Sequence, residues 1–158
     1  MLEVPDVLGL GPPYHVGIAT RRLEAAMDAL SEVFGCGWTE VREGAEPGLA
    51  SPSGPLDWTA RVTFSFGGEM HLELLEGSPG SVWQVDAVAR LHHYAFWTDD
   101  VARDVARLER DGWAVEITFF DDRGHPRNMA YLRKPGSPRI ELVDSVRRPS
   151  FLERVGAT

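Results

Sequence analysis

The chain has 158 residues and a formal net charge of −8 at pH 7, a length typical of about one domain, so we expect residues 1–158 to form a single domain. Its apolar share of 43% and charged share of 25% are ordinary for a globular protein that buries a core without disulfide bonds. The acidic balance argues against a nucleic-acid partner, because phosphate binding needs clustered Lys and Arg. The single cysteine excludes an internal disulfide and fits a cytoplasmic protein.

The chain begins with an irregular lead-in over residues 1–12, which contain Pro5, Gly9, Gly11 and Pro12. This N-terminus has neither the basic region nor the apolar stretch of a signal peptide. No apolar run in the sequence approaches the roughly 18 residues that a membrane span needs. We therefore predict no membrane partner and a cytoplasmic location.

A strand over residues 14–20 and an amphipathic helix come next. One apolar face at helical spacing predicts the helix, and its members are Leu23, Met27, Leu30, Val33 and Phe34. Gly35 and Gly37 end the helix, as glycines near a helix C-terminus commonly do. Residues 38–42 then indicate a short strand, and the Gly- and Pro-rich residues 44–57 indicate a mobile loop.

Two strands joined by a tight turn complete the first half. Residues 60–66 alternate as a half-buried strand does, and Gly67-Gly68 has the composition of a hairpin turn. The returning strand, 70–76, places Leu72 and Leu74 on one face and Glu73 on the other. Residues 77–90 follow as a linker, in which 82–89 has the apolar pattern of a short helix.

The second half repeats this order. A strand at 91–98 leads into a helix whose apolar stripe is Val101, Val105 and Leu108 and which closes at Gly112. The remaining predicted elements are strands at 113–118, 128–133 and 139–144, a polar loop at 121–127, a turn at 135–138 and one helical turn at 149–155.

The correspondence between the two halves can be checked position by position. Residues 14–30 map onto 92–108 with a constant offset of 78, which pairs His15 with His93. Residues 72–76 map onto 140–144 with an offset of 68, which pairs Glu73 with Glu141. We therefore predict an α+β fold of two tandem β-α-β-β-β modules, at about 13–76 and 91–146. Each module alone would expose a sheet face, so the two should form one curved mixed sheet around a central site.

The paired positions include four candidate metal ligands. His15 shares a strand face with Gly17 and Ala19, small residues that leave space inside a curved sheet. A lone strand Glu most often faces solvent, but Glu73 and Glu141 lie between apolar neighbours, where a buried carboxylate needs a partner or a metal. Two imidazoles and two carboxylates suit divalent Zn, Ni, Co, Fe or Mn with open positions for water or substrate. The predicted ligands are His15, Glu73, His93 and Glu141.

The chain resembles the vicinal oxygen chelate (glyoxalase) superfamily from about residue 14 to 144. The resemblance is carried by the segments 14–18 (YHVGI), 71–75 (HLELL), 91–96 (LHHYAF) and 139–143 (RIELV). The His92-His93 pair after a linker looks most like the methylmalonyl-CoA epimerase branch, in which the second histidine is the ligand. His92 would then point the other way, into packing or a second shell.

The resemblance implies a metal-dependent isomerase, epimerase or lyase that chelates two substrate oxygens and stabilises an enolate. Glu141 is the first candidate for the base that moves the proton, and Glu73 is the second. The expected substrate is a small molecule, an acyl-CoA or an oxygenated carbonyl compound, with Arg123, Arg127 and Arg133 as candidates for a CoA phosphate tail. An exposed sheet edge favours a homodimer.

Other readings of the same residues stay open. The epimerase's additional carboxylates have no clear match, although Glu43, Glu46 and Asp57 are available in or beside the loop 44–57. A ring-cleaving dioxygenase usually has two histidines and one carboxylate around iron, so Glu73 counts against it. A non-catalytic protein that binds a drug or natural product typically lacks the ligands. Aromatic residues that could line its pocket are Trp58, Phe64, Phe66, Trp83, Phe96, Trp97, Phe119 and Tyr131.

Overall fold

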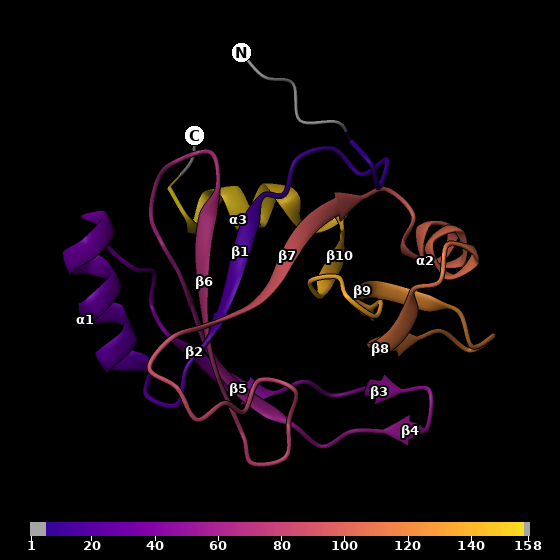
Figure 1. Cartoon of the computed structure of the whole chain (residues 1–158), viewed down its shortest axis with the longest axis horizontal. Coiled ribbons are helices and arrows are strands. Elements are labelled where there is room, and N and C mark those ends of the chain that lie inside the picture. The colour runs from indigo at the N-terminus through magenta and orange to yellow at the C-terminus, as the bar shows by residue number, and fades with distance from the viewer. Residues whose placement is uncertain (1–5, 157–158) are drawn as a thin grey trace.

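One ten-stranded mixed sheet, in the order β2-β5-β6-β1-β7-β10-β9-β8-β3-β4, is the framework of the computed structural model, which describes residues 6–156 (Figure 1). The strands are β1 (His15–Ala19), β2 (Arg42–Ala45), β3 (Leu49–Ser51), β4 (Gly54–Pro55), β5 (Thr59–Phe64), β6 (His71–Gly77), β7 (Arg90–Thr98), β8 (Ala114–Phe120), β9 (Pro126–Arg133) and β10 (Ile140–Asp144). The α-helices are α1 (Leu23–Phe34), α2 (Val101–Arg110) and α3 (Arg148–Arg154).

The strand register confirms the predicted pair of β-α-β-β-β modules. The modules meet where β1 and β7 pair antiparallel, with His15 opposite Ala95 and Gly17 opposite His93. Each of these strands also pairs in parallel with the last strand of its own module, so that Gly17 lies opposite Glu73 and Ala95 opposite Glu141. Gly17 and Ala95 are equivalent positions of the sequence repeat, as are Glu73 and Glu141. The strand register therefore has an approximate two-fold symmetry.

The sheet is strongly curved, and the chain connection between β2 and β3 shows by how much. In the strand order these two strands are eight spacings apart, about 38 Å in a flat sheet. The link from Ala45 to Leu49 reaches at most about 14 Å. The sheet therefore curls until its two ends almost meet, and the concave side encloses a space lined by both modules.

The segment 44–57, predicted as a mobile loop, is ordered and forms the closing part of this curve. It contains the β3–β4 hairpin, and β3 pairs antiparallel with β8 of the other module through Leu49 and Ala50. Leu49 is 2% exposed. The prediction was wrong because the partner strand lies far away in the sequence, so no local pattern reports the pairing.

Helix α2 packs on the outer side of the second module through the predicted apolar stripe. Val101, Val105 and Leu108 are buried in a core with residues of β7, β9 and β10. The side chain of Asp100 caps the helix by accepting a hydrogen bond from the Arg103 backbone N–H at 2.9 Å. A capped helix with a full apolar stripe is held mainly by its packing.

Helix α1 is held differently, and its predicted apolar face is correct only in part. Leu23 and Ala26 are buried against Leu74 of β6, but Val33 and Phe34 are 72% and 60% exposed. The apolar cluster under α1 contains only Leu23, Ala26 and Leu74 as buried members. Among residues 6–156, the last helical turn therefore finds little apolar surface to pack on.

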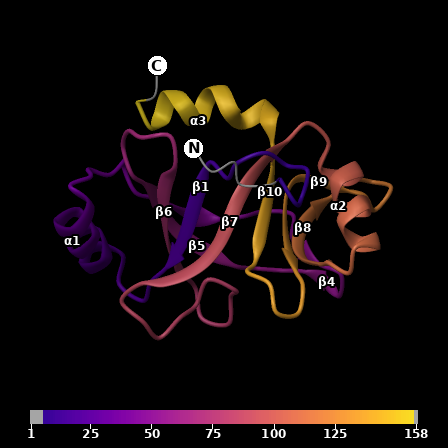
Figure 2. The same cartoon turned by 45° about the horizontal axis from the view of Figure 1, so that its top comes forward.

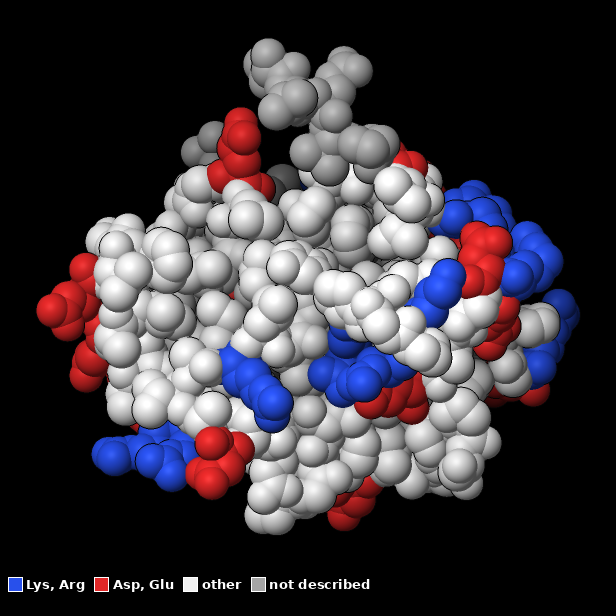
Figure 3. Space-filling view, viewed as in Figure 1, with Lys and Arg blue, Asp and Glu red and all other residues white. Residues whose placement is uncertain are grey.

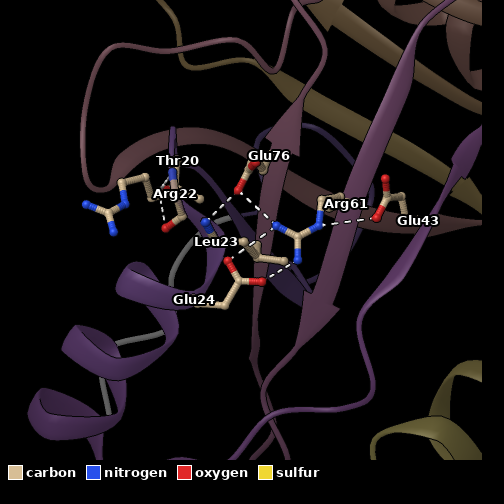
Figure 4. Close-up of polar contacts among 7 residues, drawn as sticks. All are labelled: Thr20, Arg22, Leu23, Glu24, Glu43, Arg61 and Glu76. Atoms are coloured by element: carbon tan, nitrogen blue, oxygen red, sulfur yellow. Dashed lines mark hydrogen bonds and ion pairs between the residues drawn. The ribbon is translucent and has the colours of Figure 1, made fainter.

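Charged groups fasten the start of α1 to the sheet (Figure 4). Arg22 gives no side-chain cap; instead, the Glu76 carboxylate of β6 accepts the Leu23 N–H at 2.6 Å. The guanidinium of Arg61 on β5 lies between Glu76 at 3.3 Å, Glu43 at 3.5 Å and Glu24 of the helix. These contacts join α1, β2, β5 and β6 where apolar burial is small.

Three further element predictions are corrected or confirmed. The strand expected at 38–42 begins later, at Arg42, because Trp38 forms only an isolated bridge with Ser65. The helix expected at 82–89 is absent; Trp83 is buried in the core, and residues 82–89 form turns and bends. The helical tail exists as a short 3-10 helix (145–147) followed by α3, which crosses one end of β6, β1 and β7 (Figure 2).

Residues 1–5, part of the expected lead-in and of the N-terminus inspected for a signal peptide, lie outside the described residues. Within residues 6–156, no helix has the length and apolar character needed to cross a membrane.

Candidate metal centre

The four predicted ligands meet at one point on the concave side of the sheet. Their ligand atoms all lie within 4.8 Å of one another, and all four residues are buried. The Nε2 atoms of His15 and His93 are 2.9 Å apart. The Oε2 atoms of Glu73 and Glu141 lie 3.3 and 3.2 Å from His15 Nε2, and 3.2 and 3.1 Å from His93 Nε2.

This arrangement fits a divalent cation better than it fits a hydrogen-bonded cluster. Ligand atoms about 2 Å from one ion lie about 3 Å from each other, which is the spacing observed. Neither Glu73 Oε2 nor Glu141 Oε2 has a hydrogen-bond partner, although both atoms are buried. Two imidazole N–H groups cannot point at each other across 2.9 Å, so at least one ring turns a lone pair toward the centre. Four converging acceptors are a cation's ligand set.

Without a cation, protons bound to the histidines balance the charge of the two carboxylates. Burial alone would lower the pKa of His15, but the carboxylates of Glu73 and Glu141 raise it to about 9. His93 behaves alike: burial opposes its charge, while Glu141 and Glu73 raise its pKa. Burial raises and the two imidazoles lower the pKa of each carboxyl, and the imidazoles prevail. Metal binding therefore has to displace protons from the histidines.

His93 is oriented by its neighbour in the chain. Its Nδ1 lies 2.8 Å from Nδ1 of His92, whose Nε2 lies 3.0 Å from the carbonyl oxygen of Val82. Burial, His93 and Arg139 lower the pKa of His92 to about 3, so His92 is neutral. The Val82 carbonyl only accepts, so the His92 proton is on Nε2 and its Nδ1 accepts from His93. His93 Nε2 is thereby left facing the cluster as the ligand atom.

A β-bulge turns His92 toward His93. The register moves from Gly17 opposite His93 to Ile18 opposite Leu91, so His92 is the extra, unpaired residue. A bulge re-aims a side chain that would otherwise point to the other face. His92 therefore contacts His93 from behind, which is one of the two roles predicted for it, packing or support of the ligand residue.

Gly17 makes room for the His93 ring. A Cβ at position 17 would lie 2.0 Å from His93 Cε1 and 2.3 Å from Nδ1. The equivalent position in the other module is Ala95, which lies opposite His15 and carries its Cβ fully buried. The space predicted from the small residues beside His15 is thus used by His93.

Two adjoining cavities, of about 390 and 310 Å³, lie over the cluster and share Glu73 and Glu141 in their walls. A volume of this size is typical of a small-molecule site. Much of the larger cavity is apolar, and among the aromatic residues singled out from the sequence it contains Phe64, Trp83, Phe119 and Tyr131; Trp97 lines the smaller one.

Some of the loop acids named from the sequence line the cavities, and the arginines named from it do not. Glu43 and Glu46 line the larger cavity; Asp57 is exposed and lines neither cavity. The arginines proposed for a CoA tail, Arg123, Arg127 and Arg133, are exposed and outside both cavities. The arginines that do line both cavities are Arg42, Arg147 and Arg154.

The family model described as the glyoxalase/bleomycin resistance protein/dioxygenase superfamily matches residues 14–131. The chain belongs to this superfamily. Its members typically bind a divalent metal, and the His15, Glu73, His93 and Glu141 cluster is a group that could hold one. No curated protein sequence matches the chain.

Solved structures of the superfamily share the fold. Methylmalonyl-CoA epimerase from Mycobacterium tuberculosis aligns with 90% of this chain and 92% of its own, at a TM-score of 0.59 and 17% identity. A variant of the Streptomyces coelicolor epimerase in complex with 2-nitronate-propionyl-CoA aligns with 86% of this chain and 95% of its own, at a TM-score of 0.56 and 24% identity. A variant of 4-hydroxymandelate synthase from Streptomyces coelicolor aligns with 85% of this chain and 38% of its own, at a TM-score of 0.53 and 20% identity. At these identities the likeness describes the fold.

Proposed function

We propose that this protein is a metal-dependent isomerase, epimerase or lyase that holds two substrate oxygens and moves a proton on the neighbouring carbon. The observation that carries the proposal is the buried, convergent set of His15, Glu73, His93 and Glu141 at the base of a cavity. A divalent cation bound there would polarise a substrate carbonyl and favour an enolate. The two modules supply two ligands each, which leaves open positions for substrate oxygens.

Glu141 is the proposed base, with Glu73 as the second candidate. Both carboxylates line both cavities, so each reaches the space where substrate would lie. The imidazoles lower the pKa of Glu141 against the effect of burial, which keeps the carboxylate ionised and able to accept a proton.

The test follows proton exchange with solvent. Structures of similar epimerases hold methylmalonyl-CoA or 2-nitronate-propionyl-CoA, so methylmalonyl-CoA is the first substrate to try, followed by a set of other acyl-CoA and α-hydroxycarbonyl compounds. Metal-loaded protein in deuterated water should exchange the hydrogen next to the carbonyl, as NMR would detect. Glu141→Gln should abolish exchange while substrate binding stays measurable; an unchanged rate would contradict the role of Glu141.

The matched control is Glu76→Gln, the same substitution on β6 at a residue that caps α1 instead of facing the cavity. It should leave exchange intact. Glu73→Gln separates the two candidate bases: if it alone abolishes exchange while both variants retain metal, Glu73 is the base.

Metal analysis distinguishes the alternatives. A ring-cleaving dioxygenase would need iron and a catechol-type substrate, whereas a sequestering protein would bind a hydrophobic ligand tightly in the metal-free state. On the face drawn in Figure 3, basic side chains lie in small groups with acidic ones, which supports a small-molecule partner over a nucleic acid. The homodimer and the cytoplasmic location stay predictions.

A further inference from the structure

Three arginines gather around the two cavities from distant parts of the chain. Arg42 is the first residue of β2, Arg147 ends the 3-10 helix after β10, and Arg154 ends α3. All three line both cavities, together with the carboxylates of Glu73 and Glu141. The fold thus collects positive charge at the opening of an otherwise acidic chain.

Within residues 6–156, these arginines form no ion pair. The arginine ion pairs in that range belong to Arg21, Arg61, Arg103, Arg107 and Arg139. Arg154 instead donates to the backbone carbonyl of Glu40 at 3.3 Å and lies over the Phe64 ring at 5.0 Å. Burial and the like charge of Arg42 lower the pKa of Arg154. Arg42 and Arg154 are thus close enough for their charges to repel, while Glu73 and Glu40 act in the opposite direction.

The charge balance of the cavity depends on the metal. In the metal-free protein the ionised Glu73 and Glu141 partly balance the arginines. A divalent cation would neutralise those two carboxylates, and Glu43, which also lines the larger cavity, is already paired with Arg61. Glu46 would then be the one acid left among the described lining residues against three arginines. An excess of positive charge in a partly enclosed cavity attracts anions.

We propose that Arg42, Arg147 and Arg154 bind a carboxylate or phosphate group of the substrate while its carbonyl end lies at the metal centre. This inference rests on the proposed function and names its substrate class: an anionic oxygenated carbonyl compound. Guanidinium groups suit this role, because their planar fork of donors matches both carboxylate and phosphate oxygens. The apolar wall formed by Val62, Phe64, Leu75 and Met129 receives the carbon skeleton between the two ends.

The C-terminal segment supplies two of the three arginines. Arg147 and Arg154 follow β10. Phe151 fixes the segment by packing edge-on against Tyr14 at 5.1 Å and Phe64 at 5.1 Å. A packed helix therefore sets the position of both arginines.

The experiment measures binding of simple anions to metal-loaded protein by calorimetry. The probes are malonate, inorganic phosphate and, as an uncharged analogue, dimethyl malonate. Arg147→Gln and Arg154→Gln should each weaken malonate or phosphate binding by about tenfold, the effect of losing a charge-assisted hydrogen bond. Arg148→Gln is the matched control, since Arg148 is adjacent but lines a different cavity; it should change binding less than about twofold.

The outcomes separate the two proposals. Metal content, measured first, tests the metal centre alone. If the protein holds metal and Arg147→Gln, Arg154→Gln and Arg42→Gln all bind the anions as the wild type does, the arginine proposal is overturned. Equal losses in Arg148→Gln, or equal binding of dimethyl malonate, also overturn it. Tighter binding of malonate than of phosphate assigns a carboxylate, and the reverse assigns a phosphate. Melting temperatures check that Arg154→Gln, which loses the bond to Glu40, remains folded.

Discussion

The two modules place their histidines in equivalent positions but support them differently. His93 is hydrogen-bonded at its outer nitrogen to His92, whereas the buried outer nitrogen of His15 has no partner. The position equivalent to His92 is Tyr14, which stacks on Trp97 at 3.8 Å instead. The duplicated sheet thus positions the candidate ligands, while residues particular to each half orient them. We infer that His93 is the more rigidly held ligand.

The largest expected effect comes from exchanging the residues beneath the two rings. Gly17→Ala should weaken metal binding by more than about 100-fold, beyond the range of a lost outer contact, because the new Cβ would overlap the fully buried His93 ring. Ala95→Gly should retain the metal and lower the free energy of unfolding by about 0.5–1 kcal/mol. Competition with a chromophoric chelator measures the affinities. Equal metal affinities in the two variants would contradict the difference inferred between His93 and His15.

The next effect tests the support of His93 directly. His92→Phe should lower metal affinity by about 10–100-fold, because the ring of His93 loses the partner that fixes its tautomer. Tyr14→Phe, at the equivalent position, should change metal affinity less than about twofold, since Tyr14 contacts His15 only through ring packing. If both variants bind metal alike, His92 has no orienting role.

The pH dependence of metal affinity reports on the protons that the cation displaces. The pKa of His15 is raised to about 9 and that of His93 is also raised, so the metal-free cluster holds a proton at neutral pH that a bound cation displaces. Metal affinity should therefore rise with pH and level off above about pH 9, with proton release on binding. Isothermal calorimetry in buffers of different ionisation enthalpy counts those protons. An affinity that stays constant from pH 6 to 9 would contradict the raised values.

The smallest expected effect on metal affinity concerns the rings behind the candidate ligands. Phe64 lies opposite Glu73, and Tyr131 lies opposite Glu141; the Tyr131 hydroxyl accepts the Trp83 Nε1–H at 3.1 Å. Tyr131→Phe gives the second module the phenyl ring that Phe64 supplies in the first. The Trp83 Nε1–H is then left buried without a partner, which should reduce the free energy of unfolding by about 1–3 kcal/mol. Denaturant unfolding measures it. Metal affinity should change little, and a large change would show that Tyr131 also supports His93.

The cluster of two histidines and two acids could be predicted from the sequence because two local rules agree there. Strand alternation gives the face of each side chain, and the repeat pairs His15 with His93 and Glu73 with Glu141. The register then brings all four to one place, since Gly17 and Ala95 occupy equivalent positions beside the two acids. The superfamily was likewise predictable from these segments, and the family model confirms it.

What could not be predicted depends on pairing between distant strands. The bulge at His92 reverses the strand alternation locally, and it exists only in the register of β7 against β1. The β3–β4 hairpin is stabilised by β8, so the Gly and Pro residues of 44–57 suggested a loop. Arg42, Arg147 and Arg154 come together through the curl of the sheet and the return of the C-terminal segment. None of these has a signal within its own stretch of sequence.

X-ray absorption spectroscopy of the protein loaded with one equivalent of Zn²⁺ tests the central claim most directly. The account predicts a first shell of nitrogen and oxygen with scattering from two imidazoles, because His15 and His93 supply Nε2 atoms and Glu73 and Glu141 supply oxygens. Glu141→Gln should keep both imidazole signals. A spectrum with one imidazole, or with a sulfur ligand from Cys36, would contradict the account.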